Sequence, residues 1–194
     1  MLALTTMVVV SCDKGPDTTG PAWRAAELYA PGLHVGEIVS DSARRRYRLV
    51  VTPYVGYVDS TYRGPDGFGG LAVVVDEHVD DIKSSVSRSA RVKSLGLTAD
   101  SAAAARATRS RLQAVLGRPK EICYTGTPGQ HFRAFYWPGD HDDGVLLVSP
   151  RTSRDSDVGL PSGQRSQRDQ ASLTLGTGDP SSMDGISLEP CIED

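Results

Sequence analysis

The segment 98–149 constrains the fold of this chain most, because it joins the clearest helix signal to a series of strand signals. Thr98 is a suitable helix N-cap, and the four consecutive alanines at 102–105 have the highest helix propensity of any residue. Gly117 and the proline two residues later are typical of a helix end. The sequence therefore predicts a helix over 98–116.

Apolar runs on both sides of this helix predict an antiparallel sheet. The runs at 54–62 and 71–75 flank a turn rich in Gly, Pro and Asp, which indicates a hairpin. After the helix, strands are expected at 121–124, 131–137 and 145–148. The predicted fold class is therefore α+β, with an antiparallel sheet packed against one main helix.

Shorter elements are predicted from weaker patterns. The spacing of apolar residues favours a helix over 23–29, and an apolar segment with an uncertain structure follows at 33–39. The segment 40–48 fits either a helix capped by Ser40 or the entry to a strand. A weak helix is expected over 82–92, where apolar residues recur every four positions.

The predicted organisation has two α+β halves behind a terminal segment. Two landmarks match in order, Pro53 with Pro119 and Gly70 with Gly144, and they fit either two related halves or chance similarity between two α+β halves. The polar segment 150–170 has almost nothing to bury, which predicts a mobile loop. The parts are a signal-like segment (1–11), a tether (12–22), a first half (23–97) and a second half (98–194).

Residues 1–11 are apolar and uncharged and lead directly to Cys12, after which the sequence becomes polar and rich in Gly, Pro and Thr. This pattern is typical of a short signal-like segment and its processing site. Val9-Val10-Ser11-Cys12 resembles the lipobox of bacterial lipoproteins, in which the cysteine is lipidated and becomes the new N-terminus. The segment departs from that family by having no Lys or Arg before the apolar run.

The lipobox resemblance implies that Cys12 carries a lipid anchor. The protein would then be attached to a membrane of the bacterial cell envelope and face the periplasm or the exterior. The polar segment 12–22 would serve as a flexible tether. The alternative is that 2–10 forms a buried strand and that Cys12 is a core thiol.

The number of cysteines left to pair with each other depends on whether Cys12 is lipidated. If Cys12 is lipidated, Cys123 and Cys191 remain as a pair in a compartment where disulfides persist. We predict that these two cysteines, 68 positions apart (191 − 123), form a disulfide bond. The alternative is that they are two unrelated buried thiols.

The turn at 139–144 holds the densest set of candidate metal ligands. Asp140, Asp142 and Asp143 offer carboxylates of the kind that bind Ca²⁺, and His141 suits a transition metal. The spacing is not that of an EF-hand loop. An ordinary hairpin turn also explains the same residues, because Asp and Gly are common in such turns.

The composition argues against several function classes. A net charge of −3 provides no basic surface for nucleic acid. The sequence contains neither a nucleophile elbow nor a glycine-rich phosphate loop, and no cofactor is predicted. We therefore expect a non-catalytic module that binds or scaffolds an envelope protein. The alternative is a hydrolase or metal-dependent enzyme that uses His131 or His141 with the turn Asp140–Asp143.

Strand aromatics are candidates for a partner-binding surface or for the core. They are Tyr54, Tyr57, Tyr62, Phe132, Tyr136 and Trp137.

The region 95–148 also resembles small helix-plus-sheet modules of bacterial envelope proteins. The features that carry the resemblance are Leu116-Gly117-Arg118-Pro119 at the helix end, a strand containing Cys123, and an aromatic hairpin with Trp137. Similar modules occur in small lipoproteins of the outer-membrane assembly machinery and in β-lactamase inhibitory proteins. The resemblance implies a binding or scaffolding module without catalysis, and it assigns no binding residue.

Overall fold

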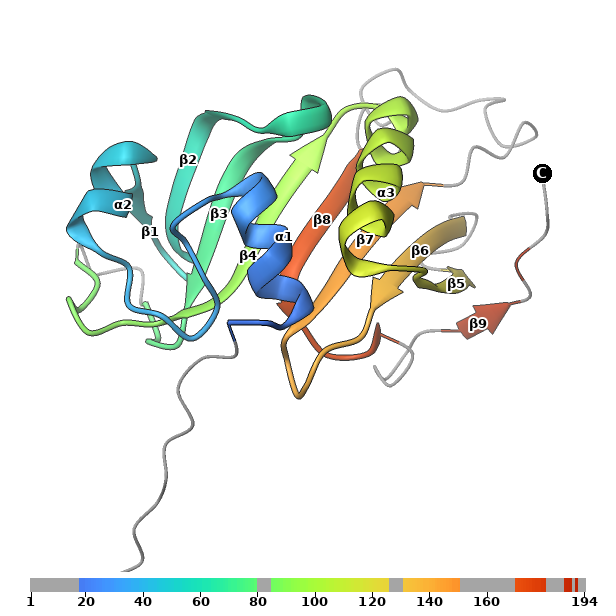
Figure 1. The fold of residues 1–194 in the computed structure, drawn as a ribbon. Helices are drawn as coiled ribbons and strands as arrows, with labels where there is room; N and C mark the ends of the chain where they lie inside the picture. Colours follow the sequence, from blue (N-terminus) through green and yellow to red (C-terminus); the bar gives the residue numbers. More distant parts are fainter. Residues whose placement is uncertain are drawn as a thin grey trace, which may run out of the picture.

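The protein folds around one antiparallel sheet (Figure 1). The computed structural model describes residues 18–79, 85–125, 131–150, 170–180, 187–189 and 191. Within these residues, helices and a single sheet confirm the predicted α+β class. No helix in this part of the chain is both long enough and apolar enough to cross a membrane. The signal-like segment, Cys12 and nearly all of the predicted mobile loop (150–170) lie outside the described residues.

The sheet has nine strands, and every neighbouring pair is antiparallel. In spatial order the strands are β1 (Val50–Thr52), β2 (Gly56–Arg63), β3 (Gly69–Val75), β4 (Val92–Ala99), β8 (Ala171–Thr177), β7 (Gly144–Pro150), β6 (His131–Trp137), β5 (Lys120–Thr125) and β9 (Ser187–Glu189).

Two consecutive groups of four strands build most of this sheet. Strands β1 to β4 form one meander and β5 to β8 form another, and the two meet where β4 pairs with β8. The boundary predicted between residues 97 and 98 therefore falls inside β4. Gly70 and Gly144 both lie in the third strand of their meander, whereas Pro53 follows β1 and Pro119 precedes β5. The repeat stays a prediction.

Helices cover one face of the sheet. These are α1 (Pro21–Tyr29), α2 (Asp41–Arg46) and α3 (Ala102–Leu116), with a short 3-10 helix η1 (Pro65–Gly67) beside α3. Figure 1 shows α1 and α3 on the same side of the sheet, where they pack on each other and on β7 and β8.

The predicted start of the main helix at Thr98 is wrong. Leu95 and Leu97 are buried and alternate with more exposed neighbours, so this segment continues the sheet as β4. The helix begins at Ala102, and the Ser101 hydroxyl caps it by accepting the backbone N–H of Ala104 at 3.1 Å.

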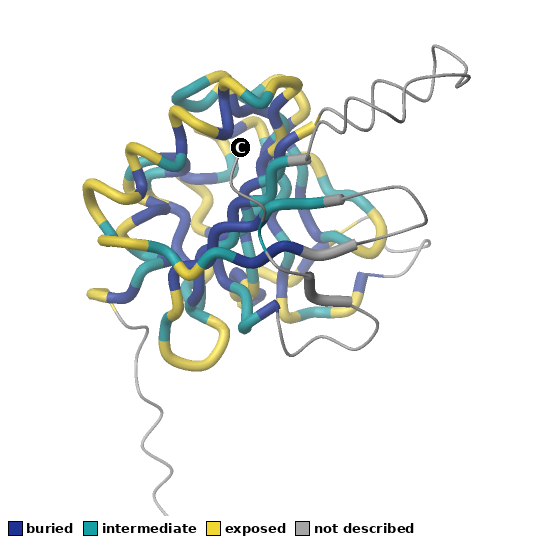
Figure 2. Tube along the Cα trace, turned by 90° about the vertical axis from the view of Figure 1, so that its right-hand side faces the viewer, coloured by how far each residue is buried: buried dark blue, intermediate teal, exposed yellow. Residues whose placement is uncertain are grey.

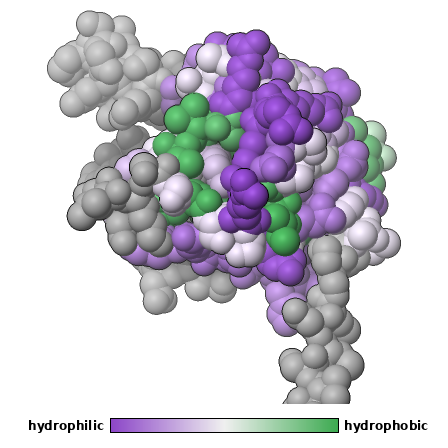
Figure 3. All heavy atoms as spheres, turned by 90° about the vertical axis from the view of Figure 1, so that its left-hand side faces the viewer, coloured by the Kyte–Doolittle hydropathy of each residue, from purple (hydrophilic) through white to green (hydrophobic). Residues whose placement is uncertain are grey.

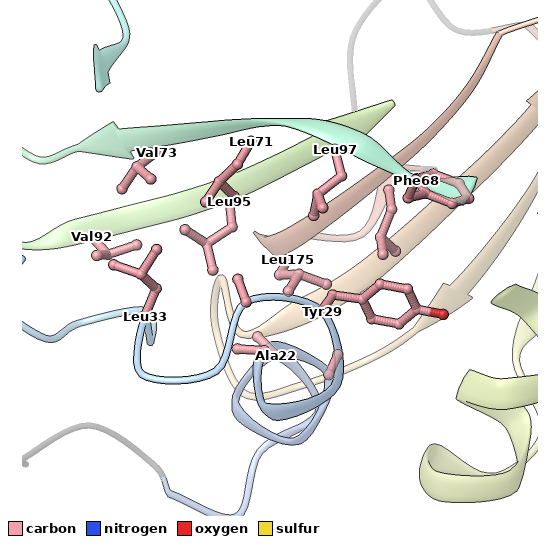
Figure 4. Close-up of a cluster of buried hydrophobic side chains, with 14 of the residues drawn as sticks. Ala22, Tyr29, Leu33, Phe68, Leu71, Val73, Val92, Leu95, Leu97 and Leu175 are labelled. Carbon is pink, nitrogen blue, oxygen red and sulfur yellow. The ribbon is translucent and has the colours of Figure 1, made fainter. Parts of the chain in front are cut away.

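The core lies between the helices and the sheet. In β3, β4 and β8, alternate large apolar residues point toward the helices, where they meet α1 residues such as Tyr29 (Figure 4). Buried positions follow the strands through the middle of the molecule (Figure 2). Each fully buried Leu or Val contributes on the order of 2 kcal/mol of hydrophobic stabilisation.

Several weaker predictions have definite outcomes. Helix α2 with its Ser40 cap confirms the helical alternative for 40–48, and the strand follows at β1. Segment 33–39 is an irregular connection whose buried Leu33 and Val39 pack on the core. The described part of 82–92 is not helical, and β4 begins at Val92.

Candidate binding surface

The turn 139–144, whose acids could belong to a metal site or to an ordinary hairpin turn, supports the start of helix α1. The backbone carbonyl of Asp143 accepts the N–H of Ala22 at 3.1 Å. A side-chain Cβ at Gly20 would lie 1.6 Å from a carboxylate oxygen of Asp143, so this carboxylate lies directly against the helix N-terminus. A negative charge is favourable there because the N–H groups of the first helical turn carry a partial positive charge and have no partner within the helix. Asp143 therefore has a structural role that the sequence did not indicate.

Asp142, another acid of the turn, lies near the end of a neighbouring strand. The pKa of Tyr136 is raised by burial and then by the nearby carboxylates of Asp179 and Asp142. Asp179 also accepts the Lys120 ammonium at 2.9 Å. Asp142 and Asp179, 37 positions apart (179 − 142), thus come close to the same phenol. For His131 the backbone lies in β6, and its side chain is outside the described part.

One group of three potential metal ligands converges in the described ranges, and it is not in this turn. It comprises a carboxylate oxygen of Glu121 and the sulfurs of Cys123 and Cys191, all within 4.8 Å of one another. The two sulfurs are bonded to each other, which confirms the predicted disulfide. Both cysteines are therefore committed to a covalent bond.

A buried histidine joins α1 to the connection that follows it. The Nε2 of His34 lies 2.5 Å from a Glu27 oxygen, and its Nδ1 lies 3.1 Å from a Glu37 oxygen. The Trp23 ring stacks on the imidazole with ring centres 3.6 Å apart.

A second network connects α1, η1 and α3 through Asp66. Its carboxylate accepts both the Nε and a terminal nitrogen of Arg111, at 2.8 and 2.9 Å, and the Tyr29 hydroxyl at 2.9 Å. Thr108 lies 3.1 Å from the same hydroxyl. The hydrogen bond from Arg111 lowers the pKa of Asp66 most, although burial opposes it. Burial is also the main reason that the pKa of Tyr29 is raised.

These two networks are contacts between elements of the fold, in which the buried His34 and the mostly buried Asp66 carboxylate meet partly exposed charged side chains such as Glu27 and Arg111. Asp66 joins α1 to η1 and α3, and His34 joins α1 to the connection that follows it, through hydrogen bonds to neighbouring side chains. We therefore assign the His34 and Asp66 networks a role in stabilising the fold.

The sheet face opposite α1 and α3, which we call the open face, carries an unusual row of side chains. Strand register places Val50, Val58, Ala72, Gly96 and Thr174 next to one another across five strands. The row continues to Leu146 and Tyr136 on β7 and β6. A solvent-facing side of an antiparallel sheet normally alternates polar and charged residues. This row has no charged side chain before Lys120 at its far end.

The exposed part of the open face lies over β1, β2, β3, β4 and β8. Val50 is 65% exposed, and Val58, Ala72, Val74, Gly96 and Thr174 are half-buried. Toward β5 and β6 the same face becomes a small buried cluster of Ile122, Ala134 and Tyr136, separate from the main core. Viewed from the β1 edge, apolar patches alternate with strongly hydrophilic side chains (Figure 3). The edge is therefore mixed, whereas the row across the face is uniformly uncharged.

The strand aromatics do not form a joint surface. Tyr57, Tyr136 and Trp137 are buried, and Trp137 donates its indole N–H to the Gly117 carbonyl at 2.8 Å. Tyr54 is exposed, and Tyr62 donates to the Tyr29 carbonyl. What the sequence missed is the open face, because its members are small or aliphatic residues that only strand pairing aligns.

The chain matches no protein-family model, no curated protein and no solved structure.

Proposed function

We propose that this protein is a non-catalytic binding module of the bacterial cell envelope, and that the open face binds a protein partner. The observation that carries the proposal is the uncharged row from Val50 to Leu146. A partner that buried charges against this row would lose their hydration without gaining an opposite charge. The favoured partner therefore presents an uncharged, apolar surface of its own.

The middle of the row suits close approach. Ala72 and Gly96 are adjacent in register and carry little or no side chain. Side chains of a partner can therefore approach the backbone of β3 and β4 in the part of the row that lies between the larger side chains of Val58 and Leu146. An apolar face of limited size with a polar surround is typical of a protein interaction site.

A charge placed in the row tests this proposal. A Cβ at Gly96 would meet only the Ala72 Cβ, at 3.7 Å, so Gly96→Lys is expected to fold. An unpaired buried charge costs at least about 1.4 kcal/mol, which corresponds to roughly tenfold weaker binding. A photo-crosslinking residue at Thr174, used in native envelopes, is expected to form a protein adduct that Gly96→Lys abolishes.

The matched control places the same charge on the helix side. Ala114 is exposed on α3, so Ala114→Lys is expected to leave the Thr174 adduct unchanged. An adduct that survives Gly96→Lys, or the absence of any adduct at Thr174, would contradict the proposal. An adduct with the mass of two copies of this chain would mean that the open face binds a second copy of the protein and not a different protein.

We propose further that Cys12 carries a lipid anchor. Supporting this, an apolar segment and a small residue precede it, and a polar Gly/Pro/Thr segment follows. Lipid chains hold a protein at a membrane by burying methylene groups, so Cys12→Ser should release the protein into the soluble fraction. Membrane fractionation with immunodetection measures this. Retention of the Cys12→Ser protein in the membrane fraction would show that another feature attaches it.

A further inference from the structure

The helices carry a positive charge, although the chain as a whole is negative. Helices α1, α2 and α3 together with η1, which we call the helix layer, contain seven arginines and three acids, a net charge of +4 (7 − 3). The whole chain has a net charge of −3, so the residues outside the helix layer carry −7 (−3 − 4). The charged residues of the helix layer are Arg24, Arg44, Arg45, Arg46, Arg106, Arg109, Arg111, Glu27, Asp41 and Asp66.

Most of these guanidinium groups face solvent without a neutralising partner. Five of the seven arginines are exposed, and the other two are half-buried. Arg109 and Arg111 form ion pairs with carboxylates. The other five have no carboxylate partner among the residues that the structure describes, and the side chains of Arg45 and Arg106 have no hydrogen-bond partner there either. The helix layer therefore presents uncompensated positive charge to its surroundings.

Helix α2 lies on the same side of the sheet as α1 and α3. The guanidinium carbon of Arg44 lies 4.9 Å from the centre of the Tyr57 ring, and Tyr57 belongs to the core beneath the helices. Arg46 donates to the carbonyl of Pro31, just after α1, at 3.1 Å. The arginines of all three helices thus lie on the side shown toward the viewer in Figure 1, opposite the open face. A flat surface that meets the helix layer leaves the open face accessible.

The tether enters the fold on this side. Helix α1 begins at Pro21, and the described chain begins at Thr18, six positions after Cys12 (18 − 12). Six residues span at most about 21 Å. The inference below rests on the lipid anchor proposed for Cys12, which would hold Thr18 within this distance of the lipid headgroups.

We propose that the helix layer binds the anionic headgroups of the anchoring membrane and directs the open face away from it, toward the partner. A guanidinium group binds phosphate oxygens through paired N–H donors. Each basic side chain near an anionic membrane strengthens binding about fivefold at low ionic strength. The short tether favours a lipid surface over an acidic protein, because the anchor holds the lipid near the helix layer at all times.

Vesicle sedimentation with the purified Cys12→Ser protein tests this surface without the anchor. We expect binding to vesicles of equal parts phosphatidylglycerol and phosphatidylcholine to be at least about tenfold tighter than to phosphatidylcholine alone. Arg45→Gln/Arg106→Gln, made in the same protein, removes two exposed charges and should weaken this binding at least about tenfold. High salt screens the contact, so the Cys12→Ser protein is still expected to leave a membrane fraction washed with salt.

The matched control removes the same charge from the sheet. Arg91 and Lys93 are exposed and flank the core residue Val92, so they point to the other side of the strand. Arg91→Gln/Lys93→Gln should therefore leave vesicle binding unchanged. Equal binding to the two kinds of vesicle, or equal losses in the two double variants, would overturn the proposal. Because every protein in this experiment lacks Cys12, either result would leave the lipid anchor itself to be decided by the membrane fractionation.

An environment-sensitive fluorophore tests the orientation. Cys123 and Cys191 are bonded to each other, so a cysteine introduced into the Cys12→Ser protein is the thiol available for labelling. Ala107 is exposed on α3, and Thr174 lies on the open face. On the anionic vesicles, we expect the emission of a label at Ala107→Cys to shift to shorter wavelength, and that of a label at Thr174→Cys to stay unchanged. A shift at position 174 that equals or exceeds the shift at position 107 would overturn the orientation.

Discussion

Replacing Cys123 by alanine and Cys191 by serine is expected to lower the free energy of unfolding by about 3 kcal/mol. The bond closes a loop across a sequence separation of 68 residues. Restricting a loop of this length in the unfolded chain stabilises the folded state by on the order of 4 kcal/mol. We expect a somewhat smaller loss, because removal of a disulfide commonly costs less than the chain-entropy value.

Urea and thermal denaturation measure the effect. For a chain of this size, a loss of about 3 kcal/mol lowers Tm by roughly 6–12 °C. Cys12→Ser is the matched control, since it removes a cysteine that takes no part in the bond, and its unfolding midpoint should not change. A double variant as stable as the parent protein would show that the disulfide acts only locally at β9. Reduction of the parent protein should reproduce the loss seen in the double variant.

The disulfide was predictable from the number of cysteines together with the compartment expected for the protein. With Cys12 assigned to the lipobox, two cysteines remained, and no geometry was needed to pair them. The same sequence could not predict β9, because Ser187–Glu189 is short and has no alternating pattern long enough to identify. Its position depends on the pairing with β5 and on the bond to Cys123.

The strands were predicted best where large apolar residues alternate or cluster. The β2–β3 hairpin and strands β5 to β7 were expected from such runs. Strand β4 was missed because its Lys, Ser, Gly and Thr positions interrupt the pattern, and Thr98 then fitted a helix cap. Burial of Leu95 and Leu97 in the sheet outweighs the local capping preference of Thr98.

The open face was not predictable from the sequence for a different reason. Val58, Ala72, Gly96 and Thr174 are unremarkable one by one and are separated by up to 116 positions (174 − 58). They become a surface only when four strands place them in one row. Long-range strand order, which decides this row, is not encoded in any local pattern.

Asp66→Ala is the second substitution expected to have a large effect, a loss of about 3 kcal/mol in the free energy of unfolding. It removes the acceptor of the Tyr29 hydroxyl and of Arg111, and leaving a buried hydroxyl less well satisfied costs about 1–3 kcal/mol. Asp66 also has a left-handed backbone with φ of 58°, which alanine adopts at a further cost of about 1 kcal/mol.

Two other substitutions at Asp66 separate these causes. Asp66→Gly removes the carboxylate but accepts the positive φ, so it should be less destabilising than the alanine variant by about 1 kcal/mol. Asparagine keeps an acceptor oxygen and tolerates the left-handed backbone conformation at this position. Asp66→Asn should therefore lower the free energy of unfolding least of the three at neutral pH. Equal losses in all three variants would mean that the carboxylate charge, which all three variants lack, carries the stabilisation, and that neither a neutral acceptor nor the backbone conformation contributes.

The pH dependence distinguishes the charge from the hydrogen bonds. Because the folded-state pKa of Asp66 is lowered, the unfolded chain binds the proton more readily than the folded protein does. The stabilisation is therefore complete above about pH 4, the ordinary range of an aspartate, and is lost as the pH falls toward the lower folded-state pKa. Asp66→Asn removes this titration, so its unfolding free energy should fall less steeply in acid than that of the parent protein. Urea unfolding between pH 2 and pH 6 measures the two slopes, and parallel curves would show that Asp66 is not stabilised as a carboxylate at the α1–α3 junction.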